Sequence, residues 1–282
     1  MARSTDISPL AQVLARADAV ADGVRAPDAI ATGFPSLDRM LGGGVRSGDL
    51  IVLGGDVGSG KSAFALAVAM RAAQARHRVR FFSGEMSNDR LLERALAIEG
   101  RVRIDDLRQG VVNDVARASV GAAAVRLREV MPHFETLPIG GADALAALIE
   151  GSGLDLVVVD SLQALARGKR DTDEELADAV RRLKTVAIQQ GFAIFATAQL
   201  PHLVPRSDQR PQLDDFGAMG AVKHHADVVL ALFREAMYEN RREIEGATEL
   251  LVRKNRNGAT GYADLYFYAQ YMRFEDMLDP DR

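Results

Sequence analysis

The chain has 282 residues, 48% of them hydrophobic, which suits one main α/β domain with a short appendage. Its formal net charge of −4 excludes a uniformly basic surface, so any contact with nucleic acid must come from local loops. The absence of cysteine excludes disulfides, thiolate chemistry and cysteine zinc sites. We find no long apolar run and no signal-peptide pattern, and therefore expect a cytoplasmic protein without contact to a membrane.

The first element in chain order is an arm over residues 1–28. Ser8 and Pro9 suit the N-cap and first position of a helix, and an apolar stripe at helical spacing follows at Leu10, Val13, Leu14, Ala17 and Val20 or Ala21. Two interpretations remain open, a helix that docks on a neighbouring subunit and a frayed terminal tail. The main domain is expected over residues 29–282.

Strand patterns alternate with helical patterns from residue 31 onward. The predicted strands cover residues 49–54, 79–83, 154–160, 192–198 and 227–233. This alternation predicts an α/β fold with a mainly parallel central sheet flanked by helices. Near the end, two strand patterns surround the turn dipeptide Asn257 and Gly258, which predicts a C-terminal β-hairpin with a further strand at 271–274.

A glycine-rich run between the first of these strands and a helix over 62–75 matches the P-loop pattern G-x-x-x-x-G-K-[ST] in full. Its glycines allow backbone N–H groups to surround phosphate oxygens, the lysine neutralises the phosphates, and the final hydroxyl ligates Mg²⁺. The helix N-terminus adds its dipole. We therefore predict binding of ATP and Mg²⁺ by Gly55, Gly58, Ser59, Gly60, Lys61 and Ser62.

Three polar residues end other predicted strands. Asp160 follows an apolar run and suits the Walker B carboxylate that completes the Mg²⁺ shell with Ser62. Glu85 follows the strand 79–83, which we expect beside the P-loop strand, where a carboxylate orients the attacking water. Gln199 reaches the same edge, where a carboxamide senses the γ-phosphate by hydrogen bonding.

Ordered motifs over residues 31–274 resemble the C-terminal domain of DnaB replicative helicases. They read TGFPSLDRMLGGGVRSGDLIVLGG, FFSGEMSNDRLLERALA, RIDDLRQG, LVVVDSLQAL, RRLKTVA, AQLPH, HHADVVLALFREAMY and KNRNGATG. LDRMLGGGV, SGE, DSLQ and KNR also resemble the RadA/Sms branch of the RecA-like superfamily. The resemblance implies a RecA-like fold and an ATP-driven helicase or translocase on single-stranded DNA.

The resemblance also implies a role for each matching residue. Lys61 would bind phosphate, and Ser62 and Asp160 would hold Mg²⁺. Glu85 would be the catalytic base, and Gln199 would couple the γ-phosphate to the loops. Lys254 and Arg256 would enter the ATP site of a neighbouring subunit, which implies a homo-oligomer arranged as a hexameric ring.

Two departures from the family pattern keep a second function open. The family's N-terminal helical domain is not expected here, and Gly217 stands where the family has a basic residue in its DNA-facing loop. The remaining candidates for DNA contact are Arg167, Lys169, Arg170, Arg206 and Arg210. His224 and His225 are interpreted as structural. The alternative is a RecA-like or KaiC-like ATPase that remodels protein partners without helicase activity.

Overall fold

The computed structural model describes residues 9–22, 28–166, 168, 171–201, 206–238 and 244–277. Its α-helices are α1 (Pro9–Ala21), α2 (Pro35–Met40), α3 (Lys61–Gln74), α4 (Asn88–Gly100), α5 (Ile104–Gln109), α6 (Asp114–Glu129), α7 (Gly141–Ile149), α8 (Thr172–Gln190) and α9 (Ala221–His225). Its strands are β1 (Ala29–Ile30), β2 (Val45–Arg46), β3 (Leu50–Gly55), β4 (Val79–Ser83), β5 (His133–Thr136), β6 (Leu156–Asp160), β7 (Ala193–Gln199), β8 (Val228–Phe233), β9 (Ala247–Asn255), β10 (Gly261–Tyr268) and β11 (Arg273–Asp276).

The main sheet has nine strands in the order β11-β10-β9-β8-β3-β7-β6-β4-β5. The strands from β8 to β5 run parallel, and β9, β10 and β11 continue the sheet in antiparallel pairing. The predicted α/β fold with a parallel sheet is therefore confirmed. One detail of the prediction is wrong, because β7 and β6 lie between the P-loop strand β3 and the strand β4 that precedes Glu85.

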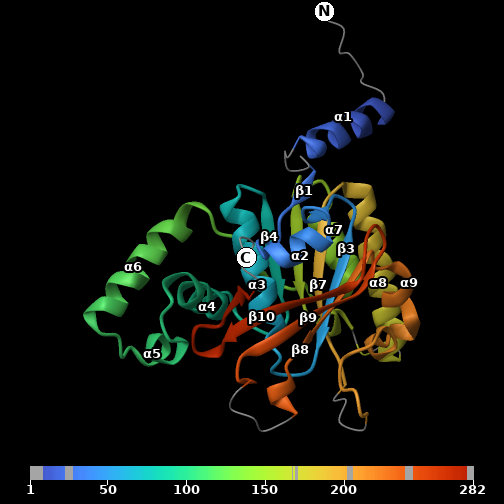
Figure 1. Cartoon of the computed structure of the whole chain (residues 1–282). Helices are drawn as coiled ribbons and strands as arrows, with labels where there is room; N and C mark the ends of the chain where they lie inside the picture. Colours follow the sequence, from blue (N-terminus) through green and yellow to red (C-terminus); the bar gives the residue numbers. More distant parts are fainter. Residues whose placement is uncertain are drawn as a thin grey trace, which may run out of the picture.

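Two hydrophobic cores cover the two faces of this sheet. Along β3, Ile51 and Leu53 point into the core beneath α3, whereas Leu50 and Val52 point into the core beneath α8. This division follows from the two-residue repeat of a strand, because both faces of a parallel sheet are covered by helices. Figure 1 shows α3 and α4 on one side of the sheet and α8 and α9 on the other.

The edge strand β5 has no counterpart among the predicted strands. Its four residues include a single buried side chain, Phe134, and His133 and Thr136 are exposed. Such a short segment lacks the alternating apolar pattern that identifies a strand. Pairing with β4 gives it strand geometry, from Arg80 opposite His133 to Ser83 opposite Thr136.

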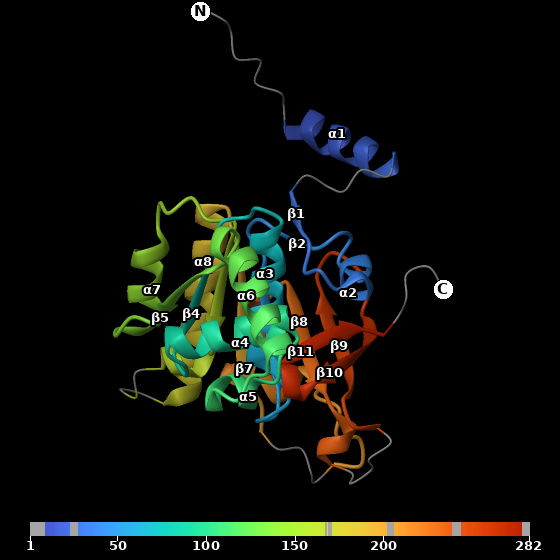
Figure 2. The same cartoon turned by 90° about the vertical axis from the view of Figure 1, so that its left-hand side faces the viewer.

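The C-terminal part forms the predicted hairpin from β9 and β10. The further strand begins at Arg273 rather than at residue 271, because residues 269–271 form a 3-10 turn and Met272 takes a left-handed φ of 53°. Figure 2 shows this antiparallel extension beside the parallel part of the sheet. Phe274 from β11 stacks on Phe267 from β10 with ring centroids 4.3 Å apart.

The helix in the arm forms as the apolar spacing predicts, over Pro9–Ala21. Its apolar residues Leu10, Val13, Leu14 and Val20 are exposed. Docking of this face on a neighbouring subunit stays a prediction. Within the described parts of the chain, every helix is too short or too polar to cross a membrane.

Candidate nucleotide-binding site

The loop between β3 and α3 has the backbone that the P-loop pattern predicts. Gly58 and Gly60 take φ angles of +83° and +101°, which glycine adopts without strain. A Cβ at Gly55 would lie 2.6 Å from Oγ of Ser59, so a side chain there would displace the loop. A Cβ at Gly60 would lie 2.7 Å from the ring of Phe274. The glycines are therefore required by the shape of the loop and by its packing against β11.

Lys61 begins α3 and turns its ammonium back toward the loop. Its Nζ donates hydrogen bonds to the carbonyl oxygens of Gly55, at 2.9 Å, and Asp56, at 2.8 Å. Burial lowers the pKa of Lys61, although Asp160, Glu85 and Asp56 oppose this effect. With phosphate oxygens as acceptors, both partners of these hydrogen bonds would be charged, which makes them stronger than the bonds to neutral carbonyl oxygens. The residue is therefore placed as a phosphate-binding lysine requires.

Ser62 and Asp160 come together as predicted. Oδ1 of Asp160 accepts hydrogen bonds from Oγ of Ser62, at 3.1 Å, and from Oγ1 of Thr197, at 2.5 Å. Burial raises the pKa of Asp160, and the two hydroxyl hydrogen bonds counteract it. Oδ2 of Asp160 is buried and has no hydrogen-bond partner among the described residues. An unsatisfied carboxylate oxygen beside a hydroxyl suits Mg²⁺, which prefers oxygen ligands.

Glu85 and Gln199 also come together, although their strands are not neighbours. Oε1 of Glu85 accepts hydrogen bonds from Oγ of Ser161, at 2.7 Å, and from Nε2 of Gln199, at 3.1 Å. Parallel strands end at one edge of the sheet, so side chains at or just after the ends of β4, β6 and β7 converge there. The result is an oriented carboxylate next to the P-loop.

These groups surround a cavity of about 340 Å³. Its lining includes Lys61, Ser62, Glu85, Asp160 and Gln199, together with residues that sequence patterns did not indicate, namely Arg94, Thr197, Arg234 and Phe267. Arg234 lies over the ring of Phe267, with its guanidinium carbon 5.0 Å from the ring centroid. It also donates a hydrogen bond to the carbonyl of Gly58 at 3.2 Å. The cavity thus combines phosphate-binding groups with an aromatic and cationic rim.

Arg94 is a cation of the cavity that the sequence patterns did not indicate. It lies in the middle of α4, where nothing in the local pattern distinguishes it from the surface arginines around it. In the structure it lines the cavity, where burial lowers its pKa and the charges of Asp160 and Glu85 oppose that effect. We infer that Arg94 supplies a second cation for the phosphates from the same subunit.

Replacing Arg94 with alanine should weaken nucleotide binding about 10- to 150-fold, because a hydrogen bond to a charged group contributes about 1.5–3 kcal/mol. Titration with a fluorescent ATP analogue measures this effect. Arg90→Ala is the matched control, since Arg90 lies on the same helix and is paired with Glu93. Equal affinities for the Arg94 variant and the unmodified protein would show that Arg94 has no role in nucleotide binding.

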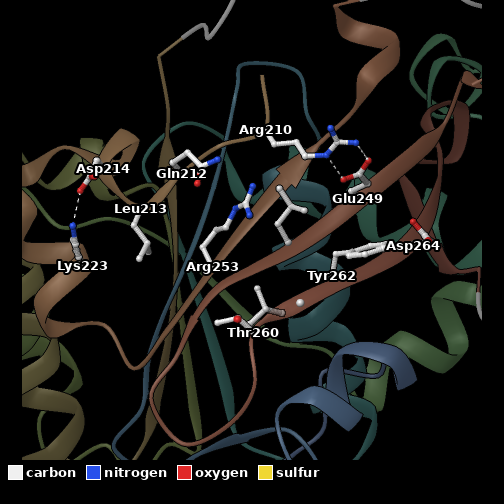
Figure 3. Close-up of a pocket in the computed structure, with 13 residues that line it drawn as sticks. Arg210, Gln212, Leu213, Asp214, Lys223, Glu249, Arg253, Thr260, Tyr262 and Asp264 are labelled. Carbon is white, nitrogen blue, oxygen red and sulfur yellow. Dashed lines mark hydrogen bonds and ion pairs between the residues drawn. The ribbon is translucent and has the colours of Figure 1, made fainter. Parts of the chain in front are cut away.

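The arginines expected to contact DNA have partners within the chain. Arg206 forms two hydrogen bonds with the carboxylate of Asp215, at 3.0 and 2.7 Å, and Arg210 forms two with Glu249, at 2.7 and 2.6 Å. Figure 3 shows Arg210 and Glu249 at a groove of about 800 Å³ beside β9 and β10. A DNA phosphate would have to compete with these carboxylates. The other three candidates, Arg167, Lys169 and Arg170, lie outside the described residues.

Lys254 and Arg256 lie at the opposite end of the sheet from their own P-loop. Lys254 donates to the carbonyl oxygen of Lys223 at 2.8 Å, and Arg256 donates to that of His224 at 3.0 Å. Lys254 lies near the end of β9 and Arg256 directly follows it. Because β9 runs antiparallel to β8, both residues lie beside the start of β3, whereas the P-loop follows the end of β3. The six residues of β3 span about 17 Å at about 3.3 Å per residue. Neither cation is placed to serve its own nucleotide site.

Near these cations, His224 and His225 end the short helix α9. Over the described part of the chain, no group of three or more His, Cys, Asp and Glu side chains is arranged to hold a metal ion. His224 contributes its carbonyl oxygen to the contacts of Arg256. Burial lowers the pKa of His225, and the nearby cations, of which Arg181 has the largest effect, lower it further.

The fold and site together define a P-loop nucleotide-binding domain of the RecA-like class. Residues 29–276 match the family model described as the DnaB-like helicase C terminal domain. The chain therefore belongs to the DnaB-like helicase C-terminal domain family.

Similar proteins agree with this assignment. The replicative DNA helicase DnaB of Geobacillus stearothermophilus is 33% identical over 257 residues, and the replicative DNA helicase DnaC of Bacillus subtilis (strain 168) is 31% identical over 257 residues. Each match covers 88% of this chain and 56% of the relative, so the chain spans about half the length of these helicases.

Solved structures show the same fold. A solved ATPase domain superimposes with a TM-score of 0.85 at 22% identity, covering 97% of this chain and 100% of that domain. A structure of a DnaB-like replicative helicase and its interactions with primase gives a TM-score of 0.83 at 22% identity and covers 94% of this chain and 66% of that one.

Proposed function

We propose that this protein hydrolyses ATP with Mg²⁺ to drive movement on single-stranded DNA. The observation that carries the proposal is the convergence of Lys61, Ser62, Asp160, Glu85 and Gln199 around one cavity. Lys61 binds phosphate, while Ser62 and Asp160 hold the metal ion, which would neutralise charge on the phosphates when bound. Glu85 accepts the proton of the attacking water, and Gln199, hydrogen-bonded to Glu85, senses the γ-phosphate.

The catalytic unit in this proposal is a homo-oligomeric ring, with hexameric assembly as the family suggests. Arg256 and Lys254 complete the nucleotide site of a neighbouring subunit, because they lie at the far end of the sheet from their own P-loop. A cation from the neighbour stabilises the charge of the transition state and couples hydrolysis to subunit movement. The exposed apolar face of α1 packs on a neighbouring subunit in the same assembly.

A second function is favoured by the loop that contains Gly217. This loop has glycine, alanine and methionine at 217–219, and Arg206 next to it is held by Asp215. A loop without a free cation contributes little to phosphate binding. The alternative is therefore an ATPase that remodels protein partners and makes no productive contact with DNA.

The rate of ATP hydrolysis with and without single-stranded DNA distinguishes the two functions. A motor on DNA is expected to hydrolyse ATP several-fold faster when the strand is present, and this stimulation should decrease steeply as salt increases. An ATPase that remodels proteins should show the same rate in both conditions. Short oligonucleotides and long strands should be compared, because translocation benefits from a long track whereas simple binding does not.

A further inference from the structure

We propose that Asp227 is a positioning residue for Arg256. Its carboxylate connects the P-loop strand of a subunit to Arg256 of the same subunit, the cation that enters the nucleotide site of the neighbour. This inference rests on the proposed trans role of Arg256. Asp227 immediately precedes β8 and has a side chain that is only 6% exposed. Its Oδ1 lies 3.0 Å from Nε of Arg256.

The contacts of Arg256 fix both its backbone and its guanidinium group. The backbone N–H of Arg256 donates to the carbonyl oxygen of Asp227 at 2.8 Å, and Nη2 donates to the carbonyl oxygen of His224 at 3.0 Å. Nη1 has no partner among the residues that the structure describes, and the side chain is 49% exposed. The guanidinium group is thus held on one side and open on the other. This arrangement orients a planar cation toward a second molecule.

The other oxygen of Asp227 connects this anchor to the nucleotide site of the same subunit. Oδ2 accepts a hydrogen bond from the backbone N–H of Leu50 at 2.8 Å and pairs with the ammonium of Lys184. The backbone N–H of Asp227 donates to the carbonyl oxygen of Leu50, also at 2.8 Å. Leu50 begins β3, which ends in the P-loop. One buried carboxylate therefore joins the start of the P-loop strand to the cation intended for the neighbour.

The test compares Asp227→Asn with the unmodified protein in ATP hydrolysis. Asparagine keeps the size of the side chain and removes the charge that holds Nε of Arg256. We expect kcat to fall about 10- to 100-fold with the KM for ATP nearly unchanged, because a small misplacement of a catalytic group has effects of this size. Asp155→Asn is the matched control. Asp155 also precedes a core strand and pairs with an arginine, Arg78, but lies far from the hairpin in strand order.

Mixing of subunits separates a positioning role from damage to the subunit's own P-loop. Asp227→Asn subunits mixed with Glu85→Gln subunits should recover turnover, since the second kind supplies an intact Arg256 to the intact Glu85 site of the first. Mixing Asp227→Asn with Arg256→Ala should give no recovery, because both are defective in the same function. If Asp227 acted only on its own P-loop strand, the two outcomes would be exchanged, and the proposal would be overturned.

The trans role of Arg256 is checked separately by mixing subunits that leave Asp227 unchanged. Recovery in mixtures of Arg256→Ala and Glu85→Gln establishes the trans arrangement itself, so its absence between subunits that are shown to exchange overturns the trans role of Arg256 together with this inference.

If Asp227→Asn does not fold, Arg256→Lys replaces it. Lysine retains the positive charge, but its side chain has a single nitrogen. It therefore cannot bind Asp227 through one nitrogen and present another to the neighbouring subunit, so turnover should be low. Full activity of Arg256→Lys would show that anchoring by Asp227 is not needed.

Discussion

Glu85→Gln protein should bind ATP nearly as tightly as the unmodified protein and hydrolyse it about a hundredfold more slowly or worse. Glutamine has the shape of glutamate and still accepts the hydrogen bond from Ser161. It cannot take a proton from water, and loss of a general base typically lowers the rate by about 10²- to 10⁴-fold. Single-turnover hydrolysis and equilibrium nucleotide binding, measured on the same preparation, separate the two effects.

The position of Glu85 makes this prediction specific. Its carboxylate accepts hydrogen bonds from Ser161 and Gln199 through one oxygen, Oε1. The site also contains a second carboxylate, Asp160, which accepts hydrogen bonds from Ser62 and Thr197. Unchanged turnover in the Glu85 variant would show that another group is the general base. A lost affinity for ATP would instead show that Glu85 has a structural role in the cavity.

Arg256→Ala protein should hydrolyse ATP about a thousandfold more slowly than the unmodified protein. This is the effect expected from removal of a cation that a neighbouring subunit supplies. Its own nucleotide cavity remains complete, because Arg256 is not among the residues that line it. Nucleotide binding by separated subunits should therefore be retained. Steady-state ATP hydrolysis and nucleotide titration measure the two properties.

Mixing then tests whether Arg256 acts across an interface. Arg256→Ala and Glu85→Gln subunits, each inactive alone, should recover part of the turnover wherever an intact Glu85 site meets an intact Arg256. A monomeric ATPase cannot show this recovery. Exchange of subunits must be verified with differently labelled chains, and absence of recovery despite exchange would contradict the trans role.

The parts of the site that could be predicted from the sequence depend on short stretches of chain. The P-loop is such a stretch, because Gly58 and Gly60 need left-handed backbone within a few residues of Lys61. Asp160, Glu85 and Gln199 could be placed because each lies at or just after the end of an apolar strand, and parallel strands end at one edge. The hairpin around Asn257 was equally local, since its turn dipeptide lies between two strand patterns.

The remaining features depend on contacts between distant segments. Arg94 and Thr197 belong to elements whose local patterns are those of an ordinary helix and an ordinary buried strand, and only the folded chain brings them to the cavity. The order of strands in the sheet also depends on distant segments. The sequence patterns therefore do not show that β7 and β6 lie between β3 and β4. The ion pair between Arg256 and Asp227 joins residues whose partnership no spacing rule predicts.

The partners of Arg206 and Arg210 show why charge patterns alone overstate nucleic-acid binding. In the sequence both residues read as exposed cations in a loop. In the structure the carboxylates of Asp215 and Glu249 bind them with two hydrogen bonds each. Such paired contacts are among the stronger hydrogen bonds of a protein surface. Their role in DNA binding stays a prediction, and it requires these pairs to open.

Displacement of a labelled strand from a forked DNA duplex tests the central claim most directly. The protein should release the strand only when ATP and Mg²⁺ are both present, and the Glu85→Gln variant should bind the fork without releasing it. Release in both the variant and the unmodified protein would indicate passive melting. Active ATP hydrolysis with no strand release on any fork would contradict the account of this protein as a DNA motor.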